Sequence, residues 1–327
     1  MTHTRELRVS LAVLVLYLVC MLTSCGGSSS SSSGSSSAMN SSSPSTASPG
    51  VPGAAAQQAT VVLVMEENHA FEDVIGSSAM PYLNGLARQG AVATQYYANV
   101  HHSLPNYLQL TTGAMVTMDD AYMGTISGDN LAHEITASGK SWKSYQEDLP
   151  SAGYLGDDVA NYIKHHNPFS YFADVAGDPA QTARIVPFSQ FAADLNANAL
   201  PSFSFVVPNR IHDAHNCPGG PLTCSDPDLL GQADQWLQSN IGPLLGNAQF
   251  QKNGLLLIVF DESRVTDIRH GGGRVPLIAV GPHAKPGAQS AAVYQHENTL
   301  RTVCDLLGLS TCPGAGATAA AETDLVH

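Results

Sequence analysis

The chain has 327 residues, of which 14 are Lys or Arg and 27 are Asp or Glu, so its formal net charge at pH 7 is −13. This acidity argues against nucleic-acid binding through the general protein surface. If the substrate is an anion, its attraction must come from a few local cations, and a bound metal ion is the simplest source.

The first 24 residues have the pattern of an export signal. Arg5 and Arg8 precede the apolar run LAVLVLYLVCML, which is too short to span a bilayer. The letters LTSC that follow resemble the lipobox of bacterial lipoproteins, and this resemblance implies that Cys25 is acylated. An ordinary secretion signal with an incidental cysteine is the alternative. We expect an exported protein, held by an N-terminal lipid anchor at the membrane, in the periplasm or at the cell surface.

Three further segments follow the signal. Residues 25–58 are dominated by Ser, Gly, Pro and Ala, a composition that buries too little apolar surface to fold, so we predict a disordered tether. Residues 59–312 are long enough for one large core and are predicted to form a single domain. The Gly- and Ala-rich residues 313–327 are predicted to form a flexible tail.

The predicted domain alternates between apolar runs and helical patterns. Continuous apolar runs occur at residues 59–65, 203–208, 255–260 and 275–281. Such runs are typical of strands that are buried on both faces. Helical patterns cover residues 80–90, 233–246 and 297–309. We therefore predict an α/β fold with a mostly parallel central sheet and helices on both faces.

Polar side chains follow three of these runs directly. Glu67 and Asn68 follow the first, Asp261 and Glu262 follow the run that ends at residue 260, and the segment NRIHDAH follows the run that ends at residue 208. Open α/β sheets bind ligands beyond the carboxyl ends of their strands. We therefore expect these acidic and amide groups to meet at one edge of the sheet.

Four cysteines remain after Cys20 and Cys25 are assigned to the signal, and they form two close pairs. These pairs are Cys217 with Cys224 and Cys304 with Cys312. Two local disulfides are expected in an exported protein. Zinc bound by all four cysteines is the alternative, although the spacings are wider than those of common zinc sites.

Five motifs resemble those of one known family. EENHAF, HHSLPNY, VVPNRIHDAH, FDES and HGGGRVP occur in this order, and together they resemble the bacterial phosphoesterases that include acid phosphatases and phospholipases C. These belong to the alkaline phosphatase-like superfamily. The resemblance spans about residues 61–310 and implies an enzyme that hydrolyses phosphoric esters.

The resemblance also implies roles for particular residues. Ser103 would be the nucleophile, and a divalent metal ion would be held by Glu67, Asn68, Ser103, Asp261 and Glu262. Asn106 would donate a hydrogen bond to a phosphoryl oxygen, and His101 fits the histidine that precedes the nucleophile. Oxygen ligands of this kind suit a hard divalent cation, which would activate the serine hydroxyl and neutralise the phosphoryl group.

A second group of residues has less defined roles. Asp213, His215 and His270 would lie around the phosphate, either as a second metal site or as acid and base groups. Arg274 would contact the phosphate or lie on the surface. Since Glu-Asn and Asp-Glu replace the mixed Asp and His ligands of two-metal relatives, one metal ion is expected and a second remains open. Five further histidines, His102, His165, His166, His212 and His296, have no assigned role, although His166 and His296 are candidates to lie just outside the metal ligands.

The sequence therefore predicts a metal-dependent phosphomonoesterase that acts through a phosphoserine on Ser103. A phospholipase C or phosphodiesterase with the same core residues is the alternative, and a non-catalytic surface lipoprotein is an alternative of another class. A serine acyl hydrolase is disfavoured because the chain has no G-x-S-x-G motif. The substrate, the identity of the metal, the pH optimum and the oligomeric state are left open.

Overall fold

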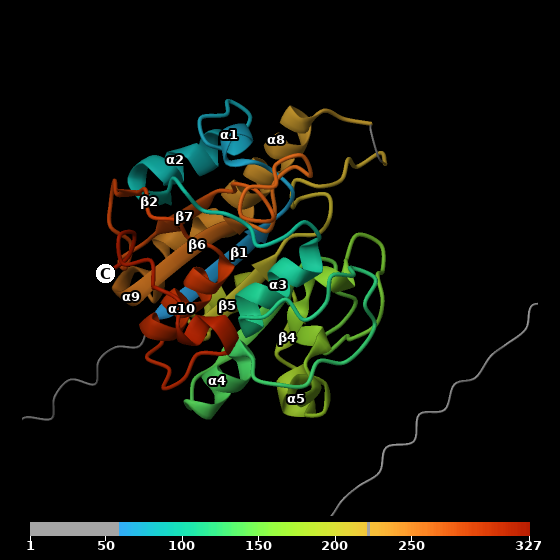
Figure 1. Ribbon diagram of the computed structural model, residues 1–327. Helices are drawn as coiled ribbons and strands as arrows, with labels where there is room; N and C mark the ends of the chain where they lie inside the picture. The colour runs from blue at the N-terminus through green and yellow to red at the C-terminus, as the bar shows by residue number, and fades with distance from the viewer. Residues whose placement is uncertain (1–58, 221–222) are drawn as a thin grey trace, which may run out of the picture. The chain divides into compact units, whose positions relative to one another are not determined.

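A computed structural model describes residues 59–220 and 223–327. Its centre is a sheet with the strand order β4-β3-β5-β1-β6-β7-β2-β8 (Figure 1). The predicted signal, Cys25 and the predicted tether lie outside the described residues. Within the described part, no helix is long and apolar enough to cross a membrane.

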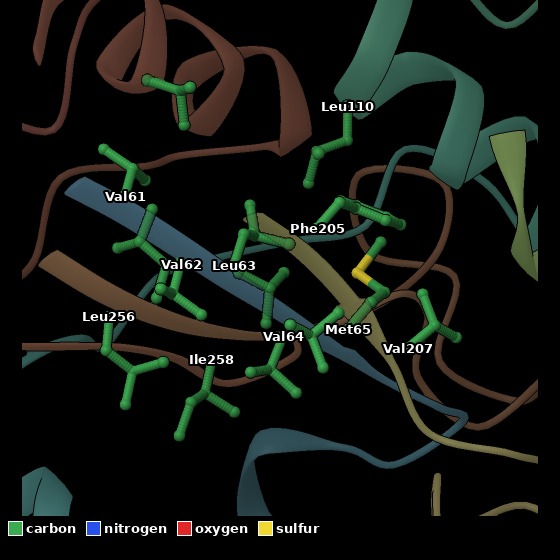
Figure 2. Packing of buried hydrophobic residues seen from close by; sticks show 14 of the residues in the cluster. Val61, Val62, Leu63, Val64, Met65, Leu110, Phe205, Val207, Leu256 and Ile258 are labelled. Atoms are coloured by element: carbon green, nitrogen blue, oxygen red, sulfur yellow. The ribbon is translucent and has the colours of Figure 1, made fainter. Parts of the chain in front are cut away.

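The middle of the sheet consists of three parallel strands that were predicted from their apolar runs. β1 (Thr60–Glu66) lies between β5 (Phe203–Val207) and β6 (Gly254–Phe260), and every residue of the three strands is buried. Successive side chains point to opposite faces of the sheet, and apolar groups pack on both faces (Figure 2). The strands therefore read as continuous apolar runs in the sequence.

The remaining strands extend the sheet on both sides. β3 (Trp142–Gln146) pairs in parallel with β5, and β4 (Ile185–Pro187) pairs in parallel with β3. On the other side, β7 (Leu277–Val280) is antiparallel to both β6 and β2 (Ala91–Ala93), and β8 (Gln289–Ser290) is parallel to β2. The prediction of a mostly parallel sheet is confirmed.

Helices cover both faces of the sheet. Figure 1 shows α1 (Phe71–Val74), α2 (Pro81–Gln89) and α8 (Asp226–Trp236) on one side, and α3 (Ser103–Thr112), α4 (Leu131–Ala137) and α10 (His296–Leu306) on the other. The other α-helices are α5 (Ala173–Ala176), α6 (Pro179–Thr182), α7 (Ser189–Asn196) and α9 (Phe250–Asn253).

The helix predicted at residues 233–246 differs from the observed one. α8 already begins at Asp226, where Ser225 and Asp228 form a capping box, and it ends at Trp236. The chain continues as a π-helical turn, Leu237–Ile241, and a 3-10 turn, Gly242–Gly246. Pro243 lacks the backbone N–H that an α-helix interior needs, which explains the change of helix type.

The prediction of a flexible C-terminal tail is wrong. Leu325 and Val326 are buried, and the N–H of Lys285 donates to the carbonyl of Leu325 at 2.8 Å. Glu322 is also buried and lies against α10 through Thr299. Two apolar residues near the end of a Gly- and Ala-rich segment are enough to dock the segment on the domain.

The predicted cysteine pairing is confirmed. Cys217 is bonded to Cys224, and Cys304 is bonded to Cys312. The zinc alternative is therefore excluded for these four residues. Disulfides of this kind are typical of proteins exported to an oxidising compartment.

Candidate active site

Ser103 is the first residue of α3 and is buried. The residue before it, His102, has a φ of 103°, a region that residues with side chains rarely adopt. This turn brings the chain sharply into the helix. The backbone N–H of Leu104 donates to Asp120 Oδ1 at 2.9 Å, so a side chain from the following loop caps the helix.

Asn106 holds the loop that leads to Ser103. Its Oδ1 accepts hydrogen bonds from the N–H groups of Asn99 and Val100, and its Nδ2 donates to the carbonyls of Val100 and His102. Both N–H bonds of the amide are thus engaged with the backbone. The predicted donation to a phosphoryl oxygen would require one of these two bonds to break.

Glu67 is the hydrogen-bond acceptor for the Ser103 hydroxyl. Ser103 Oγ donates to Glu67 Oε2 at 3.0 Å, and Asn68 Nδ2 donates to the same oxygen at 2.7 Å. The other oxygen, Oε1, accepts from the Tyr107 hydroxyl at 2.8 Å. Burial and the charge of Asp261 hold the pKa of Glu67 well above its usual range.

Asp261 lies beside Glu67, as the sequence predicted. β1 and β6 are parallel neighbours with Glu66 paired to Phe260, so the residues that follow both strands emerge at the same edge. Asp261 Oδ1 accepts from the N–H of Asn68 at 3.0 Å. Burial and the charge of Glu262 raise the pKa of Asp261, and the hydrogen bond from the N–H of Asn68 opposes this rise.

Glu262 is directed to the loop before Ser103. Its Oε2 lies 2.6 Å from His101 Nδ1, and both of its oxygens accept from the N–H of His102. His101 Nε2 lies 2.8 Å from the carbonyl of Asp267. Burial raises the pKa of Glu262 to about 7.

His166 joins the acidic groups on the other side of the site. Its Nε2 lies 3.2 Å from Glu67 Oε1, its Nδ1 lies 3.5 Å from Asp213 Oδ2, and its ring stacks on Tyr107. Burial and the charge of His215 lower the pKa of His166 to about 3. Burial raises the pKa of Asp213 to about 7. His215 itself is exposed, and its N–H donates to Asp213 Oδ1.

Two residues that were predicted to lie around the phosphate, His270 and Arg274, contact groups other than Ser103 and Glu67. His270 is exposed, and its ring centroid lies 4.2 Å from that of Tyr97. Arg274 Nε donates to the carbonyl of Thr94, and Nη1 donates to Glu72 at 2.8 Å. The Arg274 guanidinium therefore bonds to Thr94 and Glu72 rather than to Ser103.

Three contributors to the site had no assigned role in the sequence. They are Tyr107, His166 and His296, whose Nε2 lies 2.7 Å from the carbonyl of Asp261. Tyr107 occurs one turn after Ser103 on α3, a spacing that places both side chains on one helix face and could have indicated its role. His166 lies in a 3-10 turn, Lys164–His166, whose position against α3 no local pattern reveals.

The donor set fits a divalent cation only when amide and hydroxyl oxygens are included. Among the described residues, no group of three or more His, Cys, Asp or Glu side chains is arranged to hold a metal ion. Glu67 and Asp261 are the two carboxylates beside the Ser103 hydroxyl, and Asn68 adds an amide. Asp261 Oδ2 is buried and accepts no hydrogen bond from the described residues. Hard oxygen donors and an unpaired carboxylate oxygen are what Mg²⁺, Ca²⁺ or Mn²⁺ prefer.

Comparison with known proteins decides the family. The model of the phosphoesterase family matches residues 77–310. The chain is 31% identical to the phosphatidylinositol-3-phosphatase of Mycobacterium tuberculosis over 253 residues, which cover 77% of each protein. The chain belongs to the phosphoesterase family. This membership makes it a hydrolase that acts on phosphoric ester bonds, as the motifs predicted.

One further relative and one solved structure are also similar to this phosphoesterase. It is 28% identical to a probable acid phosphatase of Kluyveromyces lactis over 262 residues, which cover 77% of the chain but only 58% of that longer protein. A solved structure of a protein in the alkaline phosphatase superfamily from Vibrio parahaemolyticus superimposes with a TM-score of 0.56 at 14% identity, covering 82% of this chain and 72% of that one. The predicted alkaline phosphatase-like fold is confirmed.

Proposed function

We propose that this phosphoesterase is a metal-dependent phosphomonoesterase in which Ser103 Oγ attacks the phosphorus atom. The bond between phosphorus and the alcohol oxygen breaks, and the alcohol leaves with a proton. Water then attacks the phosphoserine, releases inorganic phosphate and restores the Ser103 hydroxyl. The observation that carries this proposal is the buried hydrogen bond from Ser103 Oγ to Glu67 Oε2 at 3.0 Å.

The residues around Ser103 have distinct tasks in this proposal. Glu67, Asn68 and Asp261, together with Ser103 Oγ, would hold one divalent metal ion, which would supply charge neutralisation for the phosphoryl group. Glu67 Oε2 accepts the hydroxyl hydrogen and is positioned to take the proton as attack begins. His215 is exposed beside Asp213 and would exchange a proton with the leaving alcohol and then with water.

A lipid-linked phosphomonoester is a second candidate substrate. The observation that favours it is the similarity to the phosphatidylinositol-3-phosphatase of Mycobacterium tuberculosis. We also propose that Cys25 carries a lipid anchor, which would keep the enzyme beside such substrates. A Cys25→Ser variant would then leave the membrane fraction of the cell, whereas the wild-type protein would stay there.

Phosphate release from p-nitrophenyl phosphate by the purified protein tests the proposal. Ser103→Ala should lose nearly all activity, while Ser263→Ala serves as the matched control. The Ser263 hydroxyl is buried and has no hydrogen-bond partner among the described residues. After an acid quench, label from a ³²P monoester should appear on Ser103. Equal hydrolysis by wild type and Ser103→Ala, or label on another residue, would exclude the serine mechanism. Release from phosphodiesters alone would favour the phospholipase C alternative.

A further inference from the structure

A cavity of about 590 Å³ is lined by residues of the loops that follow α3 and β3. This volume is in the range of pockets that hold small organic ligands. Three carboxylates line it, those of Asp120, Asp157 and Asp158, together with the cation Lys164. Met123 and Tyr171 form apolar parts of the wall, and Met123 is 59% exposed.

Two contacts connect this cavity to the nucleophile. Asp120 lines the cavity and also accepts the hydrogen bond from the N–H of Leu104, the residue directly after Ser103. His165 lines the cavity as well, and its ring packs edge-on against His166, which contacts Glu67. The lining of the cavity is therefore in direct contact with Leu104 and His166, the neighbours of Ser103 and Glu67.

The charges around the cavity do not balance. Lys164 Nζ lies 4.0 Å from Asp157 Oδ1 and 5.3 Å from the centre of the Tyr171 ring, so this one cation is paired with Asp157. His165 adds no positive charge near neutral pH, because burial lowers its pKa to about 4. Asp158 Oδ1 accepts from the backbone N–H of Lys164, which is not a charged partner. Asp120 Oδ2 lies 3.4 Å from His102 Nδ1, so among the described residues Asp158 is the lining carboxylate with no cationic side chain paired to it, and the three carboxylates still outnumber Lys164.

We propose that this cavity, called here the leaving-group pocket, receives the alcohol of the phosphate ester and selects alcohols with an ammonium group on a short apolar frame. The inference rests on the proposed function and adds the substrate class. The carboxylates attract the cation, and Met123 and Tyr171 contact its methylene or methyl groups. Because an anionic leaving group would face the same carboxylates, the pocket also discriminates against esters of acidic alcohols.

The ratio of kcat/KM for phosphocholine to that for glycerol 3-phosphate measures this selectivity. Glycerol 3-phosphate carries an uncharged alcohol of similar size. Wild type should prefer phosphocholine by about tenfold, and Asp158→Asn should reduce this ratio by about threefold or more, mainly through KM. Lys164→Met removes the paired cation and keeps an apolar side chain, so it should raise the ratio.

Asp305→Asn is the matched control, because it makes the same change of charge on α10, where Asp305 pairs with Arg301. It should leave the ratio unchanged. A wild-type ratio of one or less, or equal ratios in Asp158→Asn, Lys164→Met and wild type, would overturn the pocket assignment. If p-nitrophenyl phosphate is still hydrolysed in a Ser103-dependent way, this result overturns the pocket alone. If that activity is also missing, the proposed function fails with it.

Discussion

His101 Nδ1 and Glu262 Oε2 lie 2.6 Å apart, although 161 positions separate the two residues in the sequence. Glu262 follows β6, and His101 lies two residues before Ser103. A second pair of hydrogen bonds, from the N–H of His102 to both Glu262 oxygens, reinforces this link. The carboxylate therefore fastens the loop before Ser103 to the edge of the sheet where Asp261 emerges.

Glu262→Gln should lower kcat by about tenfold or more while the protein stays folded. The amide keeps an acceptor for the N–H of His102 but loses the charge-assisted bond to His101, so the position of Ser103 becomes less exact. Steady-state kinetics and a thermal melt check this result. Glu72→Gln is the matched control, because Glu72 pairs with Arg274 at a half-exposed position. An unchanged kcat in Glu262→Gln would show that the link has no role in positioning the nucleophile.

Removal of divalent metal should stop hydrolysis, and its return should stabilise the folded protein. At a metal concentration of about 100 times Kd, binding adds about 2.7 kcal/mol, which raises Tm by roughly 5–10 °C in a domain of this size. A melt of the chelated protein with added Mg²⁺, Mn²⁺, Ca²⁺ or Zn²⁺ measures this shift without any activity assay. Asp261→Asn should lose the shift, whereas Asp305→Asn should keep it. A chelated enzyme that retains full activity would contradict the metal proposal.

Glu322 should make the stability of the fold depend on pH. Its side chain is fully buried, and burial raises its pKa from 4.5 to about 7, although Thr299 and Thr302 hydrogen-bond to it. Between these two values the folded protein keeps a proton that the unfolded chain has released. The contribution of Glu322 to the free energy of unfolding is therefore fully present below pH 4.5. It is lost as the pH rises to about 7, which lowers the free energy of unfolding by up to about 3 kcal/mol.

A Glu322→Gln variant isolates this contribution because its amide does not titrate. Relative to wild type, the variant should gain up to about 3 kcal/mol of unfolding free energy between about pH 4 and pH 8. Urea unfolding at both pH values measures the change, and Glu72→Gln controls for the loss of a carboxylate at a more exposed position. A difference between variant and wild type that is the same at both pH values would contradict the raised pKa.

The sheet and the core of the site were predictable because both follow from strand ends. β1 and β6 are continuous apolar runs followed at once by acids, and neighbouring parallel strands bring Glu67 and Asp261 to one edge. Asp120 was not predicted to belong to the site, and His166 was only a candidate without a role, because each reaches α3 from a loop whose path is set by tertiary packing. The composition of residues 313–327 also predicted a flexible tail wrongly, because Leu325 is buried in a segment otherwise rich in small residues.

Loss of the Cys304–Cys312 disulfide should reduce stability without changing the chemistry. The bond joins α10 to the start of the docked C-terminal segment and closes a loop with a sequence separation of 8. A loop of this length constrains the unfolded chain enough to contribute about 2–3 kcal/mol. The double variant Cys304→Ala with Cys312→Ala should therefore unfold at lower urea while its kcat stays near that of wild type.

The other disulfide provides the contrast. Cys217 follows Asp213 by four positions, and Asp213 contacts His166, so replacement of Cys217 and Cys224 by Ala should lower kcat as well as stability. Urea unfolding and kinetics on both double variants separate the two effects. If the Cys304–Cys312 variant loses activity as strongly as the Cys217–Cys224 variant, the docked C-terminal segment must support the site itself. Such support would pass from Glu322 through Thr299 and Tyr96 to His296, which lies 2.7 Å from the carbonyl of Asp261.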